Sequence, residues 1–373
     1  MPDAHKSGLD TAHLLLCVLS DASTVRALTE DDWNVLIQVA RSARLLGVLG
    51  ARVEAGQMMP IVPPAVRAQL QSEQAAMAYR TRMVWWELDR LARTLGPLRV
   101  PIVLLKGAAY LIQGLRCAQL RSLSDVDVLV PRDRLSEVEE ALLSHGWEAK
   151  DLEPYDDRYY RQWSHELPPF RYGGGFLELD VHHALLPPLG RIRPDPTTLF
   201  GHAVAIPDTP FRTLAPEDQV LHAALHLLQD SDCTNRLREI VDIDALIQEF
   251  SQRAGFWDEL LEHAAEHGAG RPLWYALRFA RRLLQTQVPE QIQHRLDAYV
   301  PRLIVRWFMD VLVSTAVVPP DPDRGYPRAA RVASLLLLWR SVWLRFPPRL
   351  FLVHSITKAI PRLRSQAARP QPM

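Results

Sequence analysis

The chain has 373 residues, of which 48% are apolar and 23% charged, so it can build more than one domain around a substantial core. Lysine plus arginine and aspartate plus glutamate each number 43. This zero net charge argues against a large nucleic-acid-binding surface and against an acidic tail. The cysteines Cys17, Cys117 and Cys233 form no CxxC pair, which argues against a zinc site or disulfide framework and predicts free thiols in a reducing compartment.

Neither end of the chain has the pattern of a membrane-crossing segment. The start, MPDAHKSGLD, lacks the basic and then apolar stretches of a secretory signal, so a cytoplasmic protein is predicted. The apolar run SLLLLWRSVWL (334–344) is interrupted by Arg340 and is too short to span a bilayer. We expect a core helix here; the alternative is peripheral membrane contact through 331–360.

Residues 1–96 are predicted to form an N-terminal helical region. The stretch 31–54 has apolar residues at helical spacing, opening with Trp33, Leu36 and Ile37. Asp31 and Asp32 suit a helix start. MPIVPP ends this helix, and a second long helical pattern covers 64–95.

Residues 97–190 have a different pattern, which predicts a small mixed-sheet α/β core. A strand at about 100–105 leads through Lys106-Gly107 into a helix that ends near Gly114. RSLSDVDVLV (121–130) is a second strand, followed by a helix that Gly146 ends. RYYRQWSHELPPFRY (158–172) and GGGFLELDVHHAL (173–185) are expected to give two further strands joined at a glycine turn.

The fold class is therefore predicted as α+β, with helical regions on both sides of the α/β core. A Pro-rich connector covers 191–214, a C-terminal helical domain covers 215–362, and the tail 363–373 is expected to be disordered.

Two carboxylates alternate with valines in the 121–130 strand. Successive strand residues face opposite sides, so Val126, Val128 and Val130 share the core face while Asp125 and Asp127 project from the other, about 7 Å apart. Two like charges this close repel each other unless a cation lies between them.

A third carboxylate has a comparable setting in FLELDVHH (176–183). Alternation places Asp180 and His182 on one face of that strand, and Asp180 can meet Asp125 and Asp127 if the two strands are neighbours. Three carboxylates on one sheet face suit hard divalent cations, which take oxygen ligands. A two-metal site of this kind stabilises the attacking and leaving oxygens of phosphoryl transfer.

The turn before the Asp-x-Asp strand has the properties of a phosphate-facing element. A helix start offers free backbone N–H groups, and Gly107 permits close approach to the backbone. Lys106 and Arg121 are candidate counter-charges, although Lys106 also suits a snorkelling role and Arg121 a structural ion pair.

The combination LLKGAAYLIQG, RSLSDVDVLV and FLELDVHH resembles the polymerase-β-like nucleotidyltransferase superfamily. More narrowly, it is similar to an uncharacterised bacterial nucleotidyltransferase family with a KG turn, a DxD strand and a DxH strand. The resemblance covers roughly 30–250.

The resemblance implies a Mg²⁺-dependent nucleotidyltransferase that moves a nucleoside monophosphate from an NTP such as ATP to a hydroxyl of an unidentified acceptor. Asp125, Asp127 and Asp180 would be catalytic and would hold two Mg²⁺ ions, with Mn²⁺ as the alternative. Asp180 would also activate the acceptor. Lys106, Gly107, Arg121 and His182 would bind nucleotide or support the metal site.

Two departures from the superfamily bear on triphosphate binding, and the first of them supports an alternative. The usual turn is Gly-Ser or Gly-Gly, whereas Ala108 follows Gly107 here, and the interval from Gly107 to Asp125 is long. The alternative is a catalytically degenerate module that binds a nucleotide or a protein.

Other polar pairs are assigned to structure. His222 and His226 have the i, i+4 spacing of metal ligands, but the Glu of an H-E-x-x-H motif is absent, so packing against the α/β core is the better account. Asp242 with Arg238 is expected to be a helix-surface or interdomain pair.

Overall fold

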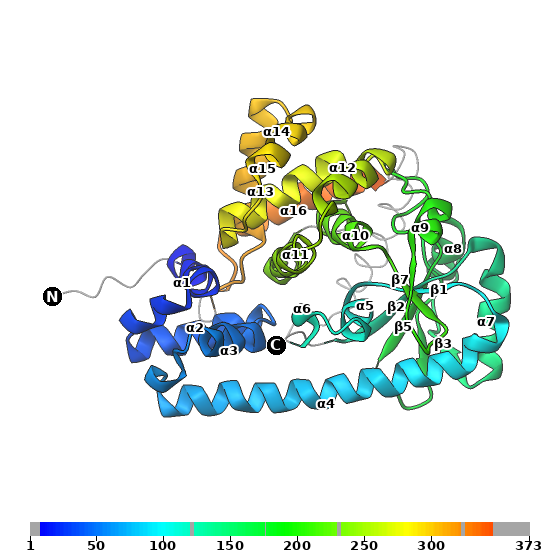
Figure 1. Cartoon of the computed structure of the whole chain (residues 1–373), viewed down its shortest axis with the longest axis horizontal. Helices are drawn as coiled ribbons and strands as arrows, with labels where there is room; N and C mark the ends of the chain where they lie inside the picture. Colours follow the sequence, from blue (N-terminus) through cyan, green and yellow to red (C-terminus); the bar gives the residue numbers. More distant parts are fainter. Residues whose placement is uncertain (1–7, 120–122, 176, 230–232, 322–324, 346–373) are drawn as a thin grey trace, which may run out of the picture.

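The computed structural model describes residues 8–119, 123–175, 177–229, 233–321 and 325–345. N-terminal helices, a seven-stranded mixed sheet and C-terminal helices follow one another along the chain (Figure 1). The predicted α+β class is confirmed.

The N-terminal region is helical, as predicted. Its elements are α1 (Gly8–Ser20), η1 (Ala22–Ala27), α2 (Glu30–Ser42), α3 (Leu46–Ala55), η2 (Met59–Ile61), α4 (Pro64–Leu95) and η3 (Gly96–Leu98). The single helix expected over 31–54 is two helices, because Arg44 adopts a left-handed backbone with φ 56° that separates α2 from α3. Thr29 caps α2 through a capping box with Asp32.

Helix α4 is 32 residues long and connects two parts of the molecule. It extends from the N-terminal helices to the far side of the sheet (Figure 1). Its buried face includes Leu70 and Met77 toward one end, and Leu88, Leu91 and Leu95 toward the other. A helix this long is stable here because packing along one face compensates for the ordering of its chain.

The sheet has the order β3-β4-β5-β2-β1-β7-β6. Its strands are β1 (Ile102–Leu104), β2 (Asp125–Leu129), β3 (Trp147–Ala149), β4 (Phe170–Tyr172), β5 (Glu178–His182), β6 (Val204–Ala205) and β7 (Phe211–Thr213). Two neighbouring pairs, β2 with β5 and β1 with β7, are parallel. The other neighbours are antiparallel.

The helices between these strands are α5 (Lys106–Ile112), α6 (Arg116–Gln119), η4 (Arg132–Arg134), α7 (Leu135–Ser144) and α8 (Pro154–Trp163). They match the prediction at α5 and α7, whereas α6 and α8 were not predicted. The strand expected over 158–172 is wrong for most of its length, because α8 occupies its first part and only β4 is a strand. Pro154 occupies the first turn of α8, and Asp157 pairs with Arg161 one turn later at 3.0 Å, which favours a helix.

The segment predicted as a Pro-rich connector contains regular structure. It forms α9 (Pro196–His202), β6 and β7, and β7 adds to the sheet beside β1. The domain boundaries themselves stay a prediction.

The C-terminal region from residue 215 is helical. Its elements are α10 (Pro216–Gln229), α11 (Leu237–Phe250), α12 (Phe256–Glu266), α13 (Gly270–Leu284), α14 (Glu290–Arg295), η5 (Leu296–Tyr299), α15 (Leu303–Ala316) and α16 (Arg328–Arg345). Helices α10 and α11 pack against α5 and α6, so they close over the side of the sheet from which the two aspartates project.

The two faces of β2 differ as the alternation predicts. Val126, Val128 and Val130 are buried in the main apolar core. On the other face, Leu129 joins a smaller apolar cluster with Val103 and Leu105. Asp125 and Asp127 lie on that second face, beyond the small cluster.

Two negative findings hold for the described residues. No helix among them is long and apolar enough to cross a membrane. Cys17, Cys117 and Cys233 are all free thiols.

Candidate active site

The parallel pairing of β2 with β5 aligns the carboxylates. Asp127 stands opposite Asp180 in the register, and Asp125 stands opposite Glu178. The same alternation that buries Val126 beside Leu179 therefore directs Asp125, Asp127 and Asp180 into one cavity of about 300 Å³. We call this cavity the Asp127 pocket.

Lys106 enters the pocket from the turn after β1. Its Nζ lies 3.1 Å from Asp127 Oδ1, and it donates a hydrogen bond to that oxygen. The Lys106 backbone is left-handed, with φ 44°, a conformation that costs a non-glycine residue about 1 kcal/mol or more. Backbone strain at the residue whose ammonium meets Asp127 is typical of a functional position.

His182 is the second group that contacts Asp127. Its Nε2 is 3.1 Å from Asp127 Oδ1 and 3.5 Å from Glu166 Oε2. Burial would lower the pKa of His182, but the Asp127 hydrogen bond and the Glu166 charge outweigh it and raise that pKa. His182 is therefore a donor to Asp127, and its buried Nδ1 has no hydrogen-bond partner among the residues that the structure describes.

His165 and Glu166 also belong to the pocket, and sequence reasoning missed both. The chain runs beside β5 here, since Leu167 N donates to Val181 O and His183 N donates to His165 O. His165 and His182 have ring centroids 5.2 Å apart. The one sequence signal is the pair of polar residues inside SHELPPF, a stretch that the sequence pattern assigns to an ordinary strand.

Helices α10 and α11 form the opposite wall. His222 and His226 of α10 line the pocket, as do Arg236, Arg238 and Asp242. The two histidines were assigned to packing alone, but their i, i+4 spacing directs both toward the aspartates.

The pairings of this wall differ from the sequence expectation in one respect. His226 Nδ1 bonds to Glu239 Oε2 at 3.1 Å, which helps hold the pKa of that carboxyl well below its usual range against the effect of burial. Asp242 is buried rather than on the helix surface, whereas Asp244 points elsewhere and pairs with Arg52 of α3 at 3.2 Å.

The carboxylates of the pocket are not equivalent electrostatically. Burial alone would raise the pKa of Asp127, but Lys106 and His182 outweigh it and hold that pKa well below its usual value. For Asp180, burial and the charges of Asp127 and Glu166 act together and raise the pKa to about 7. Burial and the same acidic surroundings raise the pKa of Tyr160 to about 12.

These residues fit a divalent cation. Burial, together with the charges of Asp127 and Glu166, raises the pKa of Asp180, and a bound cation would stabilise its ionised form. Both contacts to Asp127 fall on Oδ1. A second donor set, His165, Glu166 and His182, has its ligand atoms within 4.8 Å of one another. Asp125, Asp127 and Asp180 would hold Mg²⁺, because carboxylate oxygen is the ligand it prefers.

The predicted site residues come together with one exception. Lys106, Asp125, Asp127, Asp180 and His182 line the pocket. Gly107 is buried in the first turn of α5, next to Lys106. Arg121 lies outside the described residues.

Comparison of the chain with models of protein families finds a match. The chain belongs to an uncharacterised nucleotidyltransferase family, whose model matches residues 29–285. This confirms the resemblance found in the sequence and supports a transferase-like enzyme. The match ends at the C-terminus of α13, so α14, α15 and α16 lie beyond it. Comparison with curated proteins and with solved structures gives no match.

Proposed function

We propose that the protein is a Mg²⁺-dependent nucleotidyltransferase that transfers a nucleoside monophosphate from an NTP to a hydroxyl group of an acceptor. The observation that carries this proposal is the β2–β5 register, which brings Asp125, Asp127 and Asp180 into one pocket with Lys106.

In the proposed reaction the acceptor oxygen forms a bond to the α-phosphorus of the NTP. The bond between that phosphorus and the oxygen bridging to the β-phosphate breaks, and pyrophosphate leaves. Asp180 would take the proton of the acceptor hydroxyl, since its carboxylate lines the pocket beside Asp125 and Asp127. Bound Mg²⁺ would supply Lewis-acid stabilisation of the phosphate oxygens.

The remaining residues orient these groups. His182 donates to Asp127 and would hold that carboxylate in one orientation for a bound cation. The Lys106 ammonium offsets negative charge on the triphosphate, and Arg236 and Arg238 place further positive charge on the α11 side of the pocket. The N- and C-terminal helices would form the walls that select the acceptor.

A degenerate module that binds without turnover is the second candidate, and Ala108 favours it. Ala108 is buried in α5, so the position after Gly107 offers no hydroxyl to a phosphate.

The three free cysteines fit a reducing compartment, and a cytoplasmic location is part of the proposal.

The test is to incubate the wild type and Asp127→Asn with each α-labelled NTP, Mg²⁺ and a cell extract, and then to locate the label. We expect one NTP to label an acceptor with the wild type alone. Calorimetry with the same NTP separates the candidates, because the degenerate module would bind it without labelling anything. Equal labelling by both proteins would contradict the catalytic assignment.

A further inference from the structure

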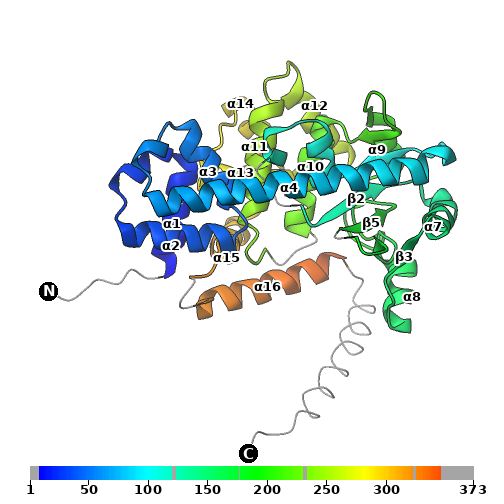
Figure 2. The ribbon, with the colours of Figure 1, turned by 90° about the horizontal axis from the view of Figure 1, so that it is seen from below.

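Helices α15 and α16 expose an apolar surface that the proposed function does not use. Twelve of the eighteen large apolar side chains exposed among the described residues belong to these two helices. The helices pack against each other, and α16 runs along one edge of the molecule (Figure 2). We call their exposed apolar side chains the α15–α16 face. A concentration of this kind marks an interaction site.

On α15 the exposed residues follow helical spacing. Leu303 and Trp307 form one row, and Ile304 and Phe308 form the adjacent row, with Leu303 72% exposed. Met309, Val313 and Ala316 of α15 are buried instead. The helix is therefore apolar on its solvent side as well as on its core side.

Helix α16 has the same organisation. Val332, Leu336, Trp339 and Trp343 recur at spacings of three and four residues and are all exposed. Its opposite face is fixed to α10, where Arg340 donates to Leu228 O and Ser341 donates to Gln229 O. The exposed row is thus held by the fold and points away from it.

The charge of this part of the chain differs from the rest. Residues 301–373 contain twelve lysines and arginines and three acidic residues, a net charge of +9, so residues 1–300 carry −9. Asp310, the one acidic residue of α15, is paired with Arg278 at 2.7 Å and Arg282 at 2.9 Å. Helix α16 contains no acidic residue in its sequence.

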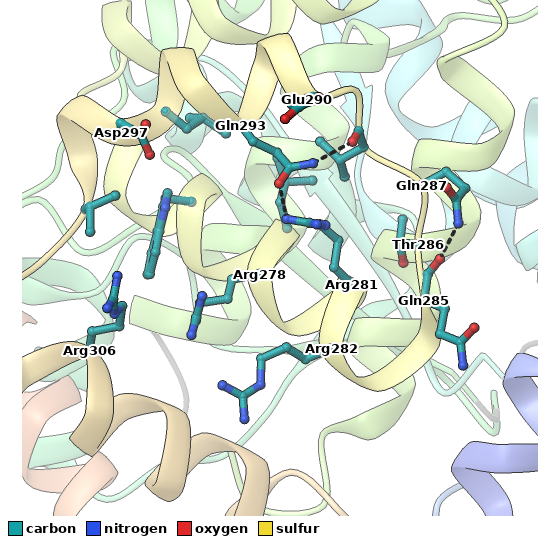
Figure 3. Close-up of a pocket in the computed structure, with 15 residues that line it drawn as sticks. Arg278, Arg281, Arg282, Gln285, Thr286, Gln287, Glu290, Gln293, Asp297 and Arg306 are labelled. Atoms are coloured by element: carbon teal, nitrogen blue, oxygen red, sulfur yellow. Dashed lines mark hydrogen bonds between the residues drawn. The ribbon is translucent and has the colours of Figure 1, made fainter. Parts of the chain in front are cut away.

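A basic cleft lies beside α15. Its volume is about 870 Å³, and Arg278, Arg281, Arg282 and Arg306 all contribute to its lining (Figure 3). Arg306 follows Val305 and precedes Trp307, so the cleft is continuous with the α15–α16 face. A concave group of arginines next to exposed tryptophans suits a phosphate group at the boundary of an apolar phase.

We propose that the α15–α16 face docks on the surface of an anionic phospholipid bilayer. The apolar side chains enter the boundary between headgroups and acyl chains, where tryptophan is favoured. The arginines contact lipid phosphates, and the net charge of +9 in the sequence of residues 301–373 favours attraction to a negative surface. A protein partner or a second copy would use the apolar residues without selecting lipid charge.

The test is co-sedimentation of the full chain with vesicles of phosphatidylcholine alone or with phosphatidylglycerol added. We expect binding to the anionic vesicles, little binding to the neutral ones, and a blue shift of tryptophan emission on binding. Replacing Trp307→Glu and Trp339→Glu together should weaken partitioning by about a hundredfold, about tenfold for each side chain withheld from the bilayer.

Two further variants make the test specific. Trp86→Glu is the matched control and should leave partitioning unchanged, because Trp86 is 63% exposed on α4. Helix α4 lies across the molecule from α15 (Figure 1). Arg302, which precedes α15, and Arg331 of α16 are both exposed. Replacing Arg302→Gln and Arg331→Gln together should weaken binding and reduce its salt dependence. Thermal melts verify that each variant is folded.

The proposal is overturned if the wild type does not bind anionic vesicles, binds both kinds equally, or binds unchanged after the double tryptophan substitution. If the wild type does not bind vesicles but forms a dimer, and the double tryptophan substitution dissociates that dimer, the face is a contact between two copies of the chain. Vesicle binding does not require turnover, so Asp127→Asn should bind like the wild type even if the catalytic proposal fails.

Discussion

Two groups of carboxylates and histidines in this molecule shift the pKa of a buried aspartate in opposite directions. In the Asp127 pocket, burial and neighbouring acids raise the pKa of Asp180 to about 7. In the second group, which we call the Asp218 cluster, His202, His263 and His267 surround the fully buried Asp218. There the histidines outweigh burial and lower the pKa of Asp218 to about 2.

The difference lies in the groups that contact each carboxylate. His263 Nδ1 is 2.8 Å from one oxygen of Asp218, and His202 Nδ1 is 3.2 Å from the other, so one carboxylate has several donors. In the Asp127 pocket, Lys106 and His182 both contact the same oxygen of one carboxylate, and Asp180 has acids for neighbours. A matched cluster stabilises the fold, whereas an excess of carboxylate leaves a place for a cation or a reacting group.

The largest expected effect is the loss of activity in Asp127→Asn. The substitution removes a carboxylate that we propose as a metal ligand and leaves Lys106 and His182 without their anionic partner. We expect the rate of nucleotide transfer to fall by about 10³-fold. Steady-state assays measure it, with Asp89→Asn as control, because Asp89 forms an exposed pair with Arg93 and should have no effect.

Asp180→Asn should separate activity from stability. Transfer should fall by about 10²-fold or more, because the proposed base is lost. Since the folded pKa of Asp180 lies above its ordinary value of 3.8, its ionisation destabilises the fold as pH rises through about 7. The variant should therefore be more stable than the wild type at pH 8, by about 2 kcal/mol in metal-free buffer after allowing for partial exposure.

Chemical denaturation with and without Mg²⁺ measures this difference. Mg²⁺ should stabilise the wild type and reduce the gap, because the ion relieves the same repulsion. A variant less stable than the wild type in metal-free buffer would show that Asp180 is paired rather than repelled.

Asp218→Asn should lower the stability of the fold, whereas Asp180→Asn raises it, and should leave the Asp127 pocket intact. The folded pKa of Asp218 is lowered, so its contribution to stability is present above pH 4 and is lost as pH falls toward 2. We expect the substitution to cost about 2 kcal/mol of unfolding free energy at pH 5 to 6.

The pH profile of that loss is the sharper measurement. The hydrogen bond to Asp218 raises the pKa of His263, despite burial, and Glu217 and Glu266 contribute to the shift. The stabilisation from His263 is present below 6.5 and is lost as pH rises through its folded pKa. The difference between wild type and Asp218→Asn should thus be largest between pH 4 and 6.5. A difference that is constant from pH 3 to 9 would mean that the cluster is not ionised as described.

The smallest effect concerns the backbone of Lys106. Lys106→Met and Lys106→Gly both remove the ammonium, but only glycine adopts φ 44° without strain. We expect Lys106→Gly to be more stable than Lys106→Met by about 1 kcal/mol, with similar losses of activity. Denaturation midpoints measure the difference, and a less stable glycine variant would argue against strain at this turn.

Much of the fold was predictable because local patterns agreed with it. The alternation of Val126, Val128 and Val130 with Asp125 and Asp127 specified both faces of β2, and burial confirms the core face. Helix α8 was missed because Tyr159, Tyr160 and Trp163 favour a strand by residue type. Its actual conformation depends on Pro154, the acidic first turn and the Asp157–Arg161 pair, all of which act at helical spacing.

The sequence by itself determined which residues could do chemistry and on which side of each strand they lie, because side-chain direction follows from backbone periodicity. The tertiary structure decided that β2 and β5 are parallel neighbours, that His165 and Glu166 enter the pocket, and that His222 and His226 close it. It also decided that Asp218 meets three histidines while Asp180 meets acids. These outcomes depend on contacts between residues far apart in the chain, for which local propensity carries no information.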